Sequence, residues 1–325
     1  MLKLLKKRTF PTGVDLGSGY IRMAQLEKSQ DGLCLTSAAY EAKPDDIEPG
    51  TADWQRWAVK ASKDIFHRGR FKSKQVITAL PSDDVFIDQI KVPNVSDEKI
   101  SEVIASKVKK KLPFSPNGAL IKHIRTELSD NHGKEIDVLV LAAEKELVNR
   151  HLAIYEKAGL EIRGIGVWPL AMINSYTNFF GRRSEEDNTI VMLMDIGSNH
   201  CNIVISKHKA LLFARVIPIG FNQLAHGEMV QRLIAEVDAC CRYFASVANS
   251  SRIERLMFMA GRNADKTICA KVAELAQKMQ IPAQIGDVLA AVRMKYGSEL
   301  TVDRRDCQIN WATAFGLSLN GIEDN

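Results

Sequence analysis

Apolar and polar residues alternate along residues 13–26, and a second apolar run, residues 33–40, follows the dipeptide Asp31-Gly32. An alternation with a period of two predicts strands, and an Asp-Gly pair between two such runs predicts a tight hairpin turn. Residues 51–68 instead place their large apolar side chains at helical spacing. Residues 76–80 form a short apolar run. The start of the chain therefore predicts antiparallel strands, one helix and a further strand.

The pattern changes after residue 84, where a more compact set of elements begins. Apolar periodicity predicts a strand, a helix that begins at Ser96, two further strands and a second helix, at residues 85–92, 96–111, 119–128, 135–142 and 144–158. The second helix ends at Gly159, a residue type that commonly follows a helix C-terminus. This β-α-β-β-α unit predicts a small subdomain, residues 85–160, that is inserted into a larger domain.

Strands and helices continue after the insert, and the charged loop 181–188 marks the clearest boundary in the chain. Beyond this loop the pattern predicts three strands, a long helix, a strand and another helix, at residues 189–219, 227–247, 256–260 and 266–279. We therefore expect an α/β protein in which residues 1–83 and 161–184 form a first domain, residues 85–160 the insert and residues 188–325 a second domain.

The most informative feature of the sequence is an internal repeat. Asp15-Leu16-Gly17-Ser18-Gly19 recurs 180 residues later as Asp195-Ile196-Gly197-Ser198-Asn199. Each copy follows the pattern of a strand that ends in an aspartate, a tight glycine-serine turn and a second strand. The separation is about that of one domain, so we expect the two copies to lie in different domains.

The residue types of this turn suit the binding of phosphate. Glycine lets the backbone approach a phosphate oxygen without interference from a Cβ atom. Successive N–H groups of such a turn form an anion-binding nest, and the serine hydroxyl adds a donor. The aspartate at the strand end can hold the water shell of a Mg²⁺ ion. Two such turns facing each other would clamp a polyphosphate, whereas two unrelated hairpins with an Asp-x-Gly turn are the alternative interpretation.

The two turns resemble the first and second phosphate loops of the actin, Hsp70 and sugar-kinase superfamily. Within that superfamily, the sequence is similar to the PilM family, which comprises actin-like proteins of the type IV pilus inner-membrane platform and is related to FtsA. Further stretches fit this family in order along nearly the whole chain, namely Ala79-Leu80-Pro81, Leu112-Pro113-Phe114, Lys157-Ala158-Gly159-Leu160, residues 215–220 and residues 314–319.

The resemblance implies an actin-like (ribonuclease H-like) α/β fold of two domains with an inserted FtsA/PilM-type subdomain. It also implies ATP with Mg²⁺ as the ligand, bound between the two turns, with Asp15 and Asp195 contacting the metal through water. The nucleotide-binding residues that it implies are Asp15, Gly17, Ser18, Gly19, Asp195, Gly197, Ser198, Asn199, Glu236 and Gly261.

Two parts of this site depart from the family pattern. The adenosine loop is a run of glycines in the family, but here it keeps only Gly261, and Arg262 places a bulky side chain where the base or ribose would pass. The second phosphate loop carries Asn199 and His200 where the family favours small or hydroxyl residues. Glu236 is expected near the ribose, and an exposed carboxylate on a helix is its alternative role.

Composition narrows the class of protein. Apolar residues make up 46% and charged residues 26% of the 325 residues, which is typical of a folded globular chain and excludes a disordered or collagen-like one. The apolar runs are far shorter than a membrane-spanning helix, and residues 1–10 lack the apolar region of a signal peptide. Six cysteines without a C-x-x-C pattern predict free thiols. The net charge of +5 does not by itself indicate nucleic acid, and no nucleic-acid partner is expected.

The PilM resemblance implies a cytoplasmic adaptor of type IV pilus assembly, peripheral on the inner membrane, that binds the N-terminal tail of a PilN-like membrane protein. Pilus motor ATPases and a second copy of the chain are further partners to consider. We expect the tail to occupy a groove between the insert and the first domain, with walls from residues 85–92 and 96–111. The lysine-rich run at residues 107–111 would then face acidic lipid or peptide, although such runs are more often solvated faces.

Under this interpretation ATP acts as a conformational ligand, and its hydrolysis is expected to be slow or absent. The reason is that no residue beyond the two turns is identifiable as a water-activating base. A nucleotide-free scaffold and a sugar-kinase-type ATP-dependent enzyme are the alternatives. Arg262 favours the scaffold, whereas no motif for a catalytic aspartate or a sugar pocket supports the kinase.

Overall fold

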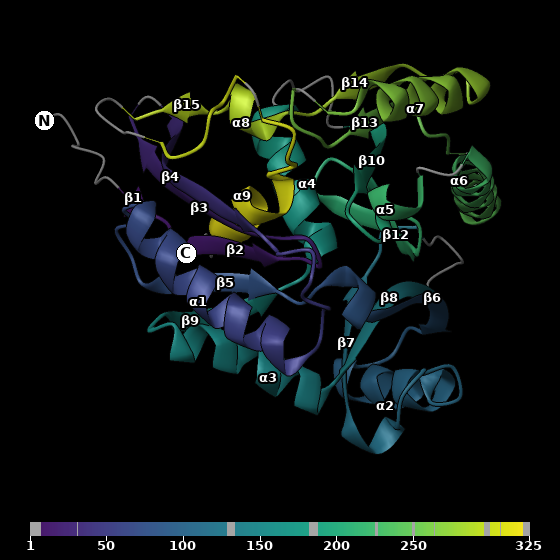
Figure 1. Cartoon of the computed structure of the whole chain (residues 1–325). Coiled ribbons are helices and arrows are strands. Elements are labelled where there is room, and N and C mark those ends of the chain that lie inside the picture. The colour runs from purple at the N-terminus through teal and green to yellow at the C-terminus, as the bar shows by residue number, and fades with distance from the viewer. Residues whose placement is uncertain are drawn as a thin grey trace, which may run out of the picture.

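The computed structural model describes residues 8–30, 32–128, 134–181, 188–224, 227–248, 251–262, 264–295, 300–305 and 307–320. Three sheets with helices around them make up this part of the chain (Figure 1). Most of residues 1–10, most of the charged loop 181–188 and one residue of the predicted Asp31-Gly32 turn lie outside the described residues. No described helix has the length and apolar character needed to cross a bilayer. All six cysteines are free thiols, as predicted.

The first sheet is built around a meander from the start of the chain. Its seven strands are β1 (Arg8–Thr9), β2 (Thr12–Leu16), β3 (Tyr20–Ser29), β4 (Gly32–Ala42), β5 (Gln75–Ala79), β9 (Glu161–Gly166) and β15 (Arg293–Met294). They lie in the order β15-β4-β3-β2-β5-β9, with β1 paired to β3. β2, β3 and β4 are antiparallel neighbours, whereas β5 and β9 continue the sheet in parallel. The predicted hairpin strands are confirmed.

The second sheet repeats this arrangement. Its five strands are β10 (Ile190–Ile196), β11 (Cys201–Lys207), β12 (Ala210–Ile217), β13 (Arg255–Phe258) and β14 (Ala283–Ile285). They lie in the order β12-β11-β10-β13-β14, with an antiparallel meander of three strands followed by two parallel strands. Leaving aside the edge strands β1 and β15, the first sheet has the same strand order. The repeat seen in the sequence is therefore a repeat of topology.

The insert forms a third, antiparallel sheet with one helix. It contains β6 (Phe86–Pro93), β7 (Ala119–Arg125) and β8 (Glu135–Glu144) in the order β6-β8-β7, and the helix is α2 (Asp97–Val108). Ile100, Ile104 and Val108 of α2 are fully buried in a cluster with side chains of β6 and β8. The apolar face predicted for this helix is thus confirmed. Ser96 precedes the helix as predicted, but its side chain makes no capping hydrogen bond.

The two edges of the inserted sheet differ in their surroundings. The edge strand β6 lies against the second sheet, where the Gln89 side-chain amide donates to the Leu212 carbonyl at 3.1 Å. At the opposite edge, β7 pairs with β8, and its Leu120 side chain is 43% exposed. The sequence predicts residues 85–92 as a wall of a groove toward the first domain. β6 instead lies against β12, through the Gln89 hydrogen bond and through Ile87, which packs on the cluster that contains Leu211 and Ala214. Phe86 and Ile90 pack in the insert's own core.

Helices cover both faces of the first sheet and flank the second. They are α1 (Ala52–Arg68), α3 (Lys145–Lys157), α4 (Trp168–Phe179), α5 (Phe221–Leu224), α6 (Gly227–Val247), α7 (Lys266–Lys278), α8 (Val288–Ala291) and α9 (Ala312–Leu319). α1 and α3 pack on one face of the first sheet, and α4 and α9 pack on the other (Figure 1). The sequence predicts α3 as the second helix of the insert, but its Ile154 and Tyr155 are buried in the core of the first sheet instead. The predicted helices near residues 227–247 and 266–279 are confirmed as α6 and α7. Thr51 caps α1 by accepting a hydrogen bond from the Trp54 amide at 3.2 Å.

The helix α9 differs from the predicted domain division. The sequence analysis assigned it to the second domain, at residues 188–325, but it packs against β2, β3, β5 and α4 and is buried throughout. The approach is close, since a Cβ atom added at Gly13 would overlap the Ala314 carbonyl. In addition, the Ser318 hydroxyl donates to the Pro11 carbonyl at 2.8 Å. Phe315 and Leu319 of α9 lie in the same buried cluster as Ala24 and Leu26 of β3.

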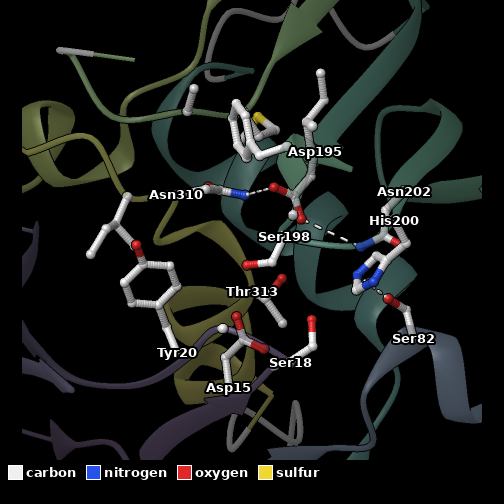
Figure 2. Close-up of a pocket in the computed structure, with 18 of the residues that line it drawn as sticks. Asp15, Ser18, Tyr20, Ser82, Asp195, Ser198, His200, Asn202, Asn310 and Thr313 are labelled. Atoms are coloured by element: carbon white, nitrogen blue, oxygen red, sulfur yellow. Dashed lines mark hydrogen bonds between the residues drawn. The ribbon is translucent and has the colours of Figure 1, made fainter. Parts of the chain in front are cut away.

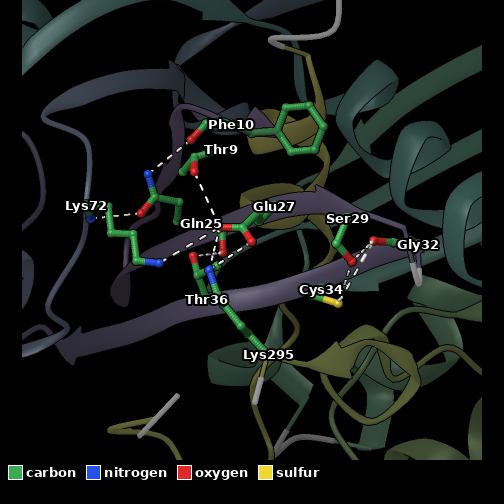
Figure 3. A network of polar contacts seen from close by, with 10 residues as sticks. All are labelled: Thr9, Phe10, Gln25, Glu27, Ser29, Gly32, Cys34, Thr36, Lys72 and Lys295. Atoms are coloured by element: carbon green, nitrogen blue, oxygen red, sulfur yellow. Dashed lines mark hydrogen bonds and ion pairs between the residues drawn. The ribbon is translucent and has the colours of Figure 1, made fainter. Parts of the chain in front are cut away.

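A second segment from the C-terminal part of the chain, β15, forms one edge of the first sheet. β15 pairs with β4, and Lys295 directly after it places its ammonium 2.7 Å and 2.8 Å from the two carboxylate oxygens of Glu27 (Figure 3). Glu27 is only 3% exposed, and the Lys72 ammonium lies 3.8 Å from the same carboxylate. A buried carboxylate is costly without such partners. The ion pair therefore fastens the segment after β15 to the sheet.

Candidate functional site

The two repeated turns meet at one cavity of about 290 Å³ between the first and second sheets. Gly17, Ser18 and Gly19 line it from one side, and Gly197 and Ser198 line it from the other. A Cβ atom added at Gly19 would overlap the Ser198 hydroxyl, so the turns come into direct contact. Figure 2 shows that the side chains of both turns point into the same space. The structure thus brings together the residues that the repeat singled out.

The two turns share one backbone geometry. In the first turn the Gly17 amide donates to the Tyr20 carbonyl at 2.9 Å, and in the second the Gly197 amide donates to the His200 carbonyl at 2.8 Å. The second turn is also clamped from outside by α5, because the Phe221 amide donates to the Gly197 carbonyl at 2.9 Å. These bonds fix the turn conformation on which an anion nest depends.

Each aspartate faces a partner on the neighbouring strand. Asp15 pairs across β2 and β3 with Arg22, whose guanidinium lies 2.7 Å from the carboxylate. Asp195 pairs across β10 and β11 with Asn202, whose amide donates to the carboxylate at 3.4 Å. Both partners lie seven residues after their aspartate, so the repeat extends to these positions. The first half of the cavity carries a cation at this position, and the second half carries a neutral amide.

Asn310 connects the two halves of the site. Its side-chain amide donates to Asp195 at 2.8 Å, and its backbone carbonyl accepts a hydrogen bond from Arg22 at 2.6 Å. Its side-chain oxygen accepts from the Ala312 amide at 2.9 Å, at the start of α9. The segment leading into α9 therefore holds both aspartate–partner pairs in register. Nothing in the sequence pattern pointed to this residue, because its role depends on contacts across 115 and 288 positions.

The electrostatics of the site centre on Asp15. Burial raises the pKa of its carboxyl above the usual range, and the nearby Asp195 raises it further. The charges of Arg22 and His200 act in the opposite direction. Among the described residues, the charged side chains that line the cavity are three aspartates, Asp15, Asp195 and Asp265, and one arginine, Arg22. The lining is therefore acidic, and an anionic ligand would need a cation to accompany it.

Several polar atoms around the cavity have no protein partner among the described residues. They are the Ser18 hydroxyl, Nε of Arg22, the Asn202 side-chain oxygen and Nδ1 of His200. Buried polar groups are normally hydrogen-bonded, so such a cluster indicates a polar ligand or ordered water. Among the described residues, no group of three or more histidine, cysteine or acidic side chains is arranged to bind a metal directly. The Ser18 and Arg22 donors and the carboxylates of the lining fit a phosphate-bearing ligand that carries its own cation.

Three predicted site residues lie outside the cavity lining. Asn199 turns away, and its side-chain oxygen accepts a hydrogen bond from Asn222 at 2.8 Å. Glu236 on α6 is half-exposed and pairs with Arg215 of β12 at 3.3 Å, which matches its alternative role. Gly261 is buried where a Cβ atom would overlap the Cys307 carbonyl. Arg262 is exposed and does not line the cavity, so it does not block it.

Four further polar residues line the cavity, although the sequence pattern did not single them out: Arg22, Ser82, Asn202 and Thr313. Arg22 and Asn202 had a detectable signal, since residues that flank a turn at matched distances face each other across a hairpin. Ser82 and Thr313 line the cavity from the first sheet's edge and from α9, and no local pattern announced them.

Comparison with known families gives this site its context. A family model described as Type IV pilus assembly protein PilM matches residues 13–230. The chain belongs to the PilM family. The matched residues include both repeated turns and the whole insert, so these elements are part of what the chain shares with other PilM proteins.

Solved structures share the fold. A chain of the PilM-PilN type IV pilus biogenesis complex is 19% identical, and the alignment covers 96% of this chain and 98% of that chain with a TM-score of 0.77. The cytoplasmic domain of EpsL, an inner-membrane component of the type II secretion system of Vibrio cholerae, is 9% identical, with 98% and 97% coverage and a TM-score of 0.51. The actin-like α/β fold with an inserted sheet, expected from the sequence, is thereby confirmed for this PilM protein.

Proposed function

We propose that this PilM protein is an adaptor of type IV pilus assembly that binds the N-terminal tail of a PilN-like inner-membrane protein. The observation that carries this proposal is the family match, together with a fold shared along nearly the full length of a chain from a PilM-PilN complex. Contacts with pilus motor ATPases and self-association remain predictions from the family resemblance. Fluorescence anisotropy of a labelled PilN-like tail tests the adaptor, and absence of saturable binding up to about 1 mM, or about −4 kcal/mol, would contradict it.

We further propose where the tail binds. Within the predicted insert 85–160, the sheet of β6, β7 and β8 with α2 forms the recognition subdomain. Residues 1–83, 161–184, α3 and α9 form the first domain beside it. A short tail can gain affinity by adding a strand to a free sheet edge and inserting a few apolar side chains. β7 offers such an edge, since its neighbour in the sheet is β8 alone. Leu120 and Lys122 are exposed two residues apart on β7, so they lie on the same face. The tail would therefore contact β7 rather than β6.

A position at the membrane surface follows from the same proposal. A short tail keeps the adaptor near the bilayer, on its cytoplasmic side. Lys107, Lys109, Lys110 and Lys111 are all exposed at the end of α2. Lys111 pairs with Asp88 at 2.8 Å, and Lys107 donates to the Lys91 carbonyl at 2.7 Å. Exposed lysines each contribute about 1 kcal/mol of attraction to an anionic bilayer, so this cluster favours docking.

Reversing two of these charges tests the membrane contact. Lys109→Glu with Lys110→Glu should weaken flotation with phosphatidylglycerol vesicles by about 10-fold or more, because two attractive charges become repulsive. The matched control reverses two exposed lysines elsewhere, Lys63→Glu on α1 with Lys266→Glu on α7. Equal losses in both double variants would show that only net charge matters. Binding to phosphatidylcholine vesicles should be negligible throughout.

We propose that the cavity binds ATP together with Mg²⁺. The support is the acidic lining, the unpartnered donors and the two opposed anion-binding turns. Ser18 and Ser198 would donate to phosphate oxygens, and Arg22 would supply the one positive charge that the described lining contains. Asp15 and Asp195 would hold the water shell of the metal, which supplies the charge needed to bring a polyphosphate to an acidic cavity. Calorimetric titration with ATP in the presence and absence of Mg²⁺ tests this.

One observation favours a second candidate, a scaffold that binds no nucleotide. The cavity of about 290 Å³ is at the small end of the range for ligand pockets, roughly 300–1,000 Å³. ATP binding therefore requires some opening between the first and second sheets. The titration separates the two candidates, since a scaffold would release no heat with ATP at any Mg²⁺ concentration.

If ATP binds, hydrolysis should be slow. Each carboxylate that lines the cavity already has partners: Asp15 pairs with Arg22, Asp195 accepts from two asparagines, and Asp265 caps α7 by accepting from the Thr267 and Ile268 amides. None is positioned as an unengaged general base for water. Turnover should therefore stay below about 1 per second, the low end of ordinary enzymes. Phosphate release measured above that rate would support the ATP-dependent enzyme instead.

A further inference from the structure

One buried hydrogen bond joins the second phosphate turn to the root of the insert, which is the segment 80–85 between β5 and β6. Nε2 of His200, the last residue of that turn, lies 2.6 Å from the Ser82 hydroxyl. Both residues are nearly inaccessible, at 8% and 6% exposure, and both line the cavity (Figure 2). Ser82 belongs to the first-sheet side and His200 to the second-sheet side. The bond therefore crosses the boundary along which the cavity would open.

Ser82 lies where movement of the insert would begin. It is the first residue of the 3₁₀ helix Ser82–Asp84. This helix forms the middle of the short connection between β5 of the first sheet and β6 of the insert. Leu80 and Pro81 before it also line the cavity. A displacement of Ser82 is thus passed to β6 through only a few residues. The hydroxyl–imidazole pair therefore joins the root of the insert to the phosphate turn, and the Asp83 carboxylate lies 4.0 Å from the other ring nitrogen of His200.

His200 is equally well placed to respond to an anion. Its ring lies over the turn, because a Cβ atom added at Gly197 would be 3.3 Å from Nε2. The turn itself is fixed by α5, with the Phe221 and Asn222 amides each donating to it at 2.9 Å. An oxygen bound above Gly197 and Ser198 would therefore meet the imidazole before it could displace the turn. Nδ1 has no hydrogen-bond partner among the described residues, and the nearest carboxylate oxygen, on Asp83, is 4.0 Å away.

We propose that Ser82 and His200 form a positioning pair that couples nucleotide binding in the cavity to the binding of the partner tail at the insert. This inference rests on the proposed function. A hydrogen bond from an imidazole to a phosphate oxygen is charge-assisted and stronger than one to a neutral hydroxyl. In this proposal Nε2 of His200 carries the proton, and a bound phosphate oxygen accepts the hydrogen bond that the Ser82 hydroxyl accepts in its absence, which releases the root of the insert. Because coupling between two binding sites is reciprocal, the tail must alter nucleotide affinity by the same factor.

The test measures a ratio rather than either affinity alone. The affinity of a labelled PilN-like tail is determined by anisotropy with and without saturating Mg-ATP, for the whole chain and its variants. The ratio of the two dissociation constants should differ from one by about 5-fold or more in the unmodified chain, the lower end of ordinary allosteric coupling. Ser82→Ala removes the hydroxyl and should bring the ratio close to one. Ser82→Thr keeps a hydroxyl and should restore it.

A matched control separates coupling from a general effect of a lost hydroxyl. Ser62 on α1 is fully buried, and its hydroxyl has no partner among the described residues. Ser62→Ala should keep the ratio of the unmodified chain. If Ser82→Ala does not fold, His200→Gln provides the second variant, and it should likewise bring the ratio close to one.

The outcomes distinguish this inference from the function on which it rests. An unmodified chain that binds both ligands with a ratio of one would overturn the coupling while leaving the adaptor and nucleotide proposals intact. A ratio that survives in Ser82→Ala and His200→Gln would show that coupling takes another route. An unmodified chain that binds no ATP, or no tail, would overturn the corresponding proposal and the coupling with it.

Discussion

Asp195→Ala is expected to weaken Mg-ATP binding by about 10-fold or more, the usual effect of losing a group that orients a metal's water shell. The carboxylate lies at the end of β10, faces the cavity and is held by Asn202 and Asn310. Its removal also takes one negative charge from an acidic lining. ATP without Mg²⁺ should therefore bind no worse than before, and somewhat better. Calorimetric titration with and without Mg²⁺ measures both effects.

The control for this experiment is Glu236→Ala. The family resemblance implies that Glu236 lies near the ribose, whereas the structure places it on α6, paired with Arg215 and outside the cavity lining. This variant should bind Mg-ATP as the unmodified chain does. Unchanged affinity in Asp195→Ala, or an equal loss in both variants, would contradict the assignment of the cavity. Matching circular dichroism would establish that both variants are folded.

Leu120→Glu should weaken binding of the PilN-like tail by about 10-fold or more. Burying a leucine side chain at an interface contributes about 1.5–3 kcal/mol, and about 1.4 kcal/mol corresponds to tenfold in affinity. The substitution also puts a charge where an apolar contact is expected, which adds a desolvation cost. Because Leu120 is 43% exposed, the fold itself should tolerate the change. Anisotropy of the labelled tail measures the loss.

An exposed apolar residue on another edge strand provides the matched control. Ile285 on β14 is 40% exposed, and β14 is the outer strand of the second sheet. Ile285→Glu should leave tail binding unchanged. Equal tail affinities for both variants and the unmodified chain would show that the tail does not dock on β7. A loss in both variants would indicate that the tail contacts a different or much larger surface.

Local patterns predicted the elements of this fold well, and their long-range partners less well. The period-two alternation located β2, β3 and β4, and helical spacing located α6 and α7 almost to the residue. β14 and β15 were missed, because two or three residues show no periodicity. Residues 314–319 were recognised from the family resemblance and placed in the second domain, whereas α9 packs against the first sheet. An all-round apolar helix indicates burial without indicating which surface buries it.

The site residues show the same difference between local patterns and long-range contacts. The repeat identified the two turns, because backbone approach to a phosphate restricts the residue types within a short stretch. The positions of Asn199, Glu236 and Gly261 relative to the cavity depended on packing that the repeat does not encode. Asn310 and Ser82 act through partners more than 100 positions away, at Asp195 and His200. Contacts of that kind leave no mark in the local sequence.

The placement of α9 has a consequence for how this chain is synthesised. The first sheet is translated early, but one of its faces is completed by Trp311 and Phe315, which leave the ribosome only after the insert and the second sheet. Until then the Ala24, Leu26, Leu35 and Ala38 side chains of β3 and β4 lack this cover, a state that invites aggregation and chaperone binding. Closing so long a loop is also slow. Folding of the first sheet therefore depends on a helix that is translated after the insert and the second sheet.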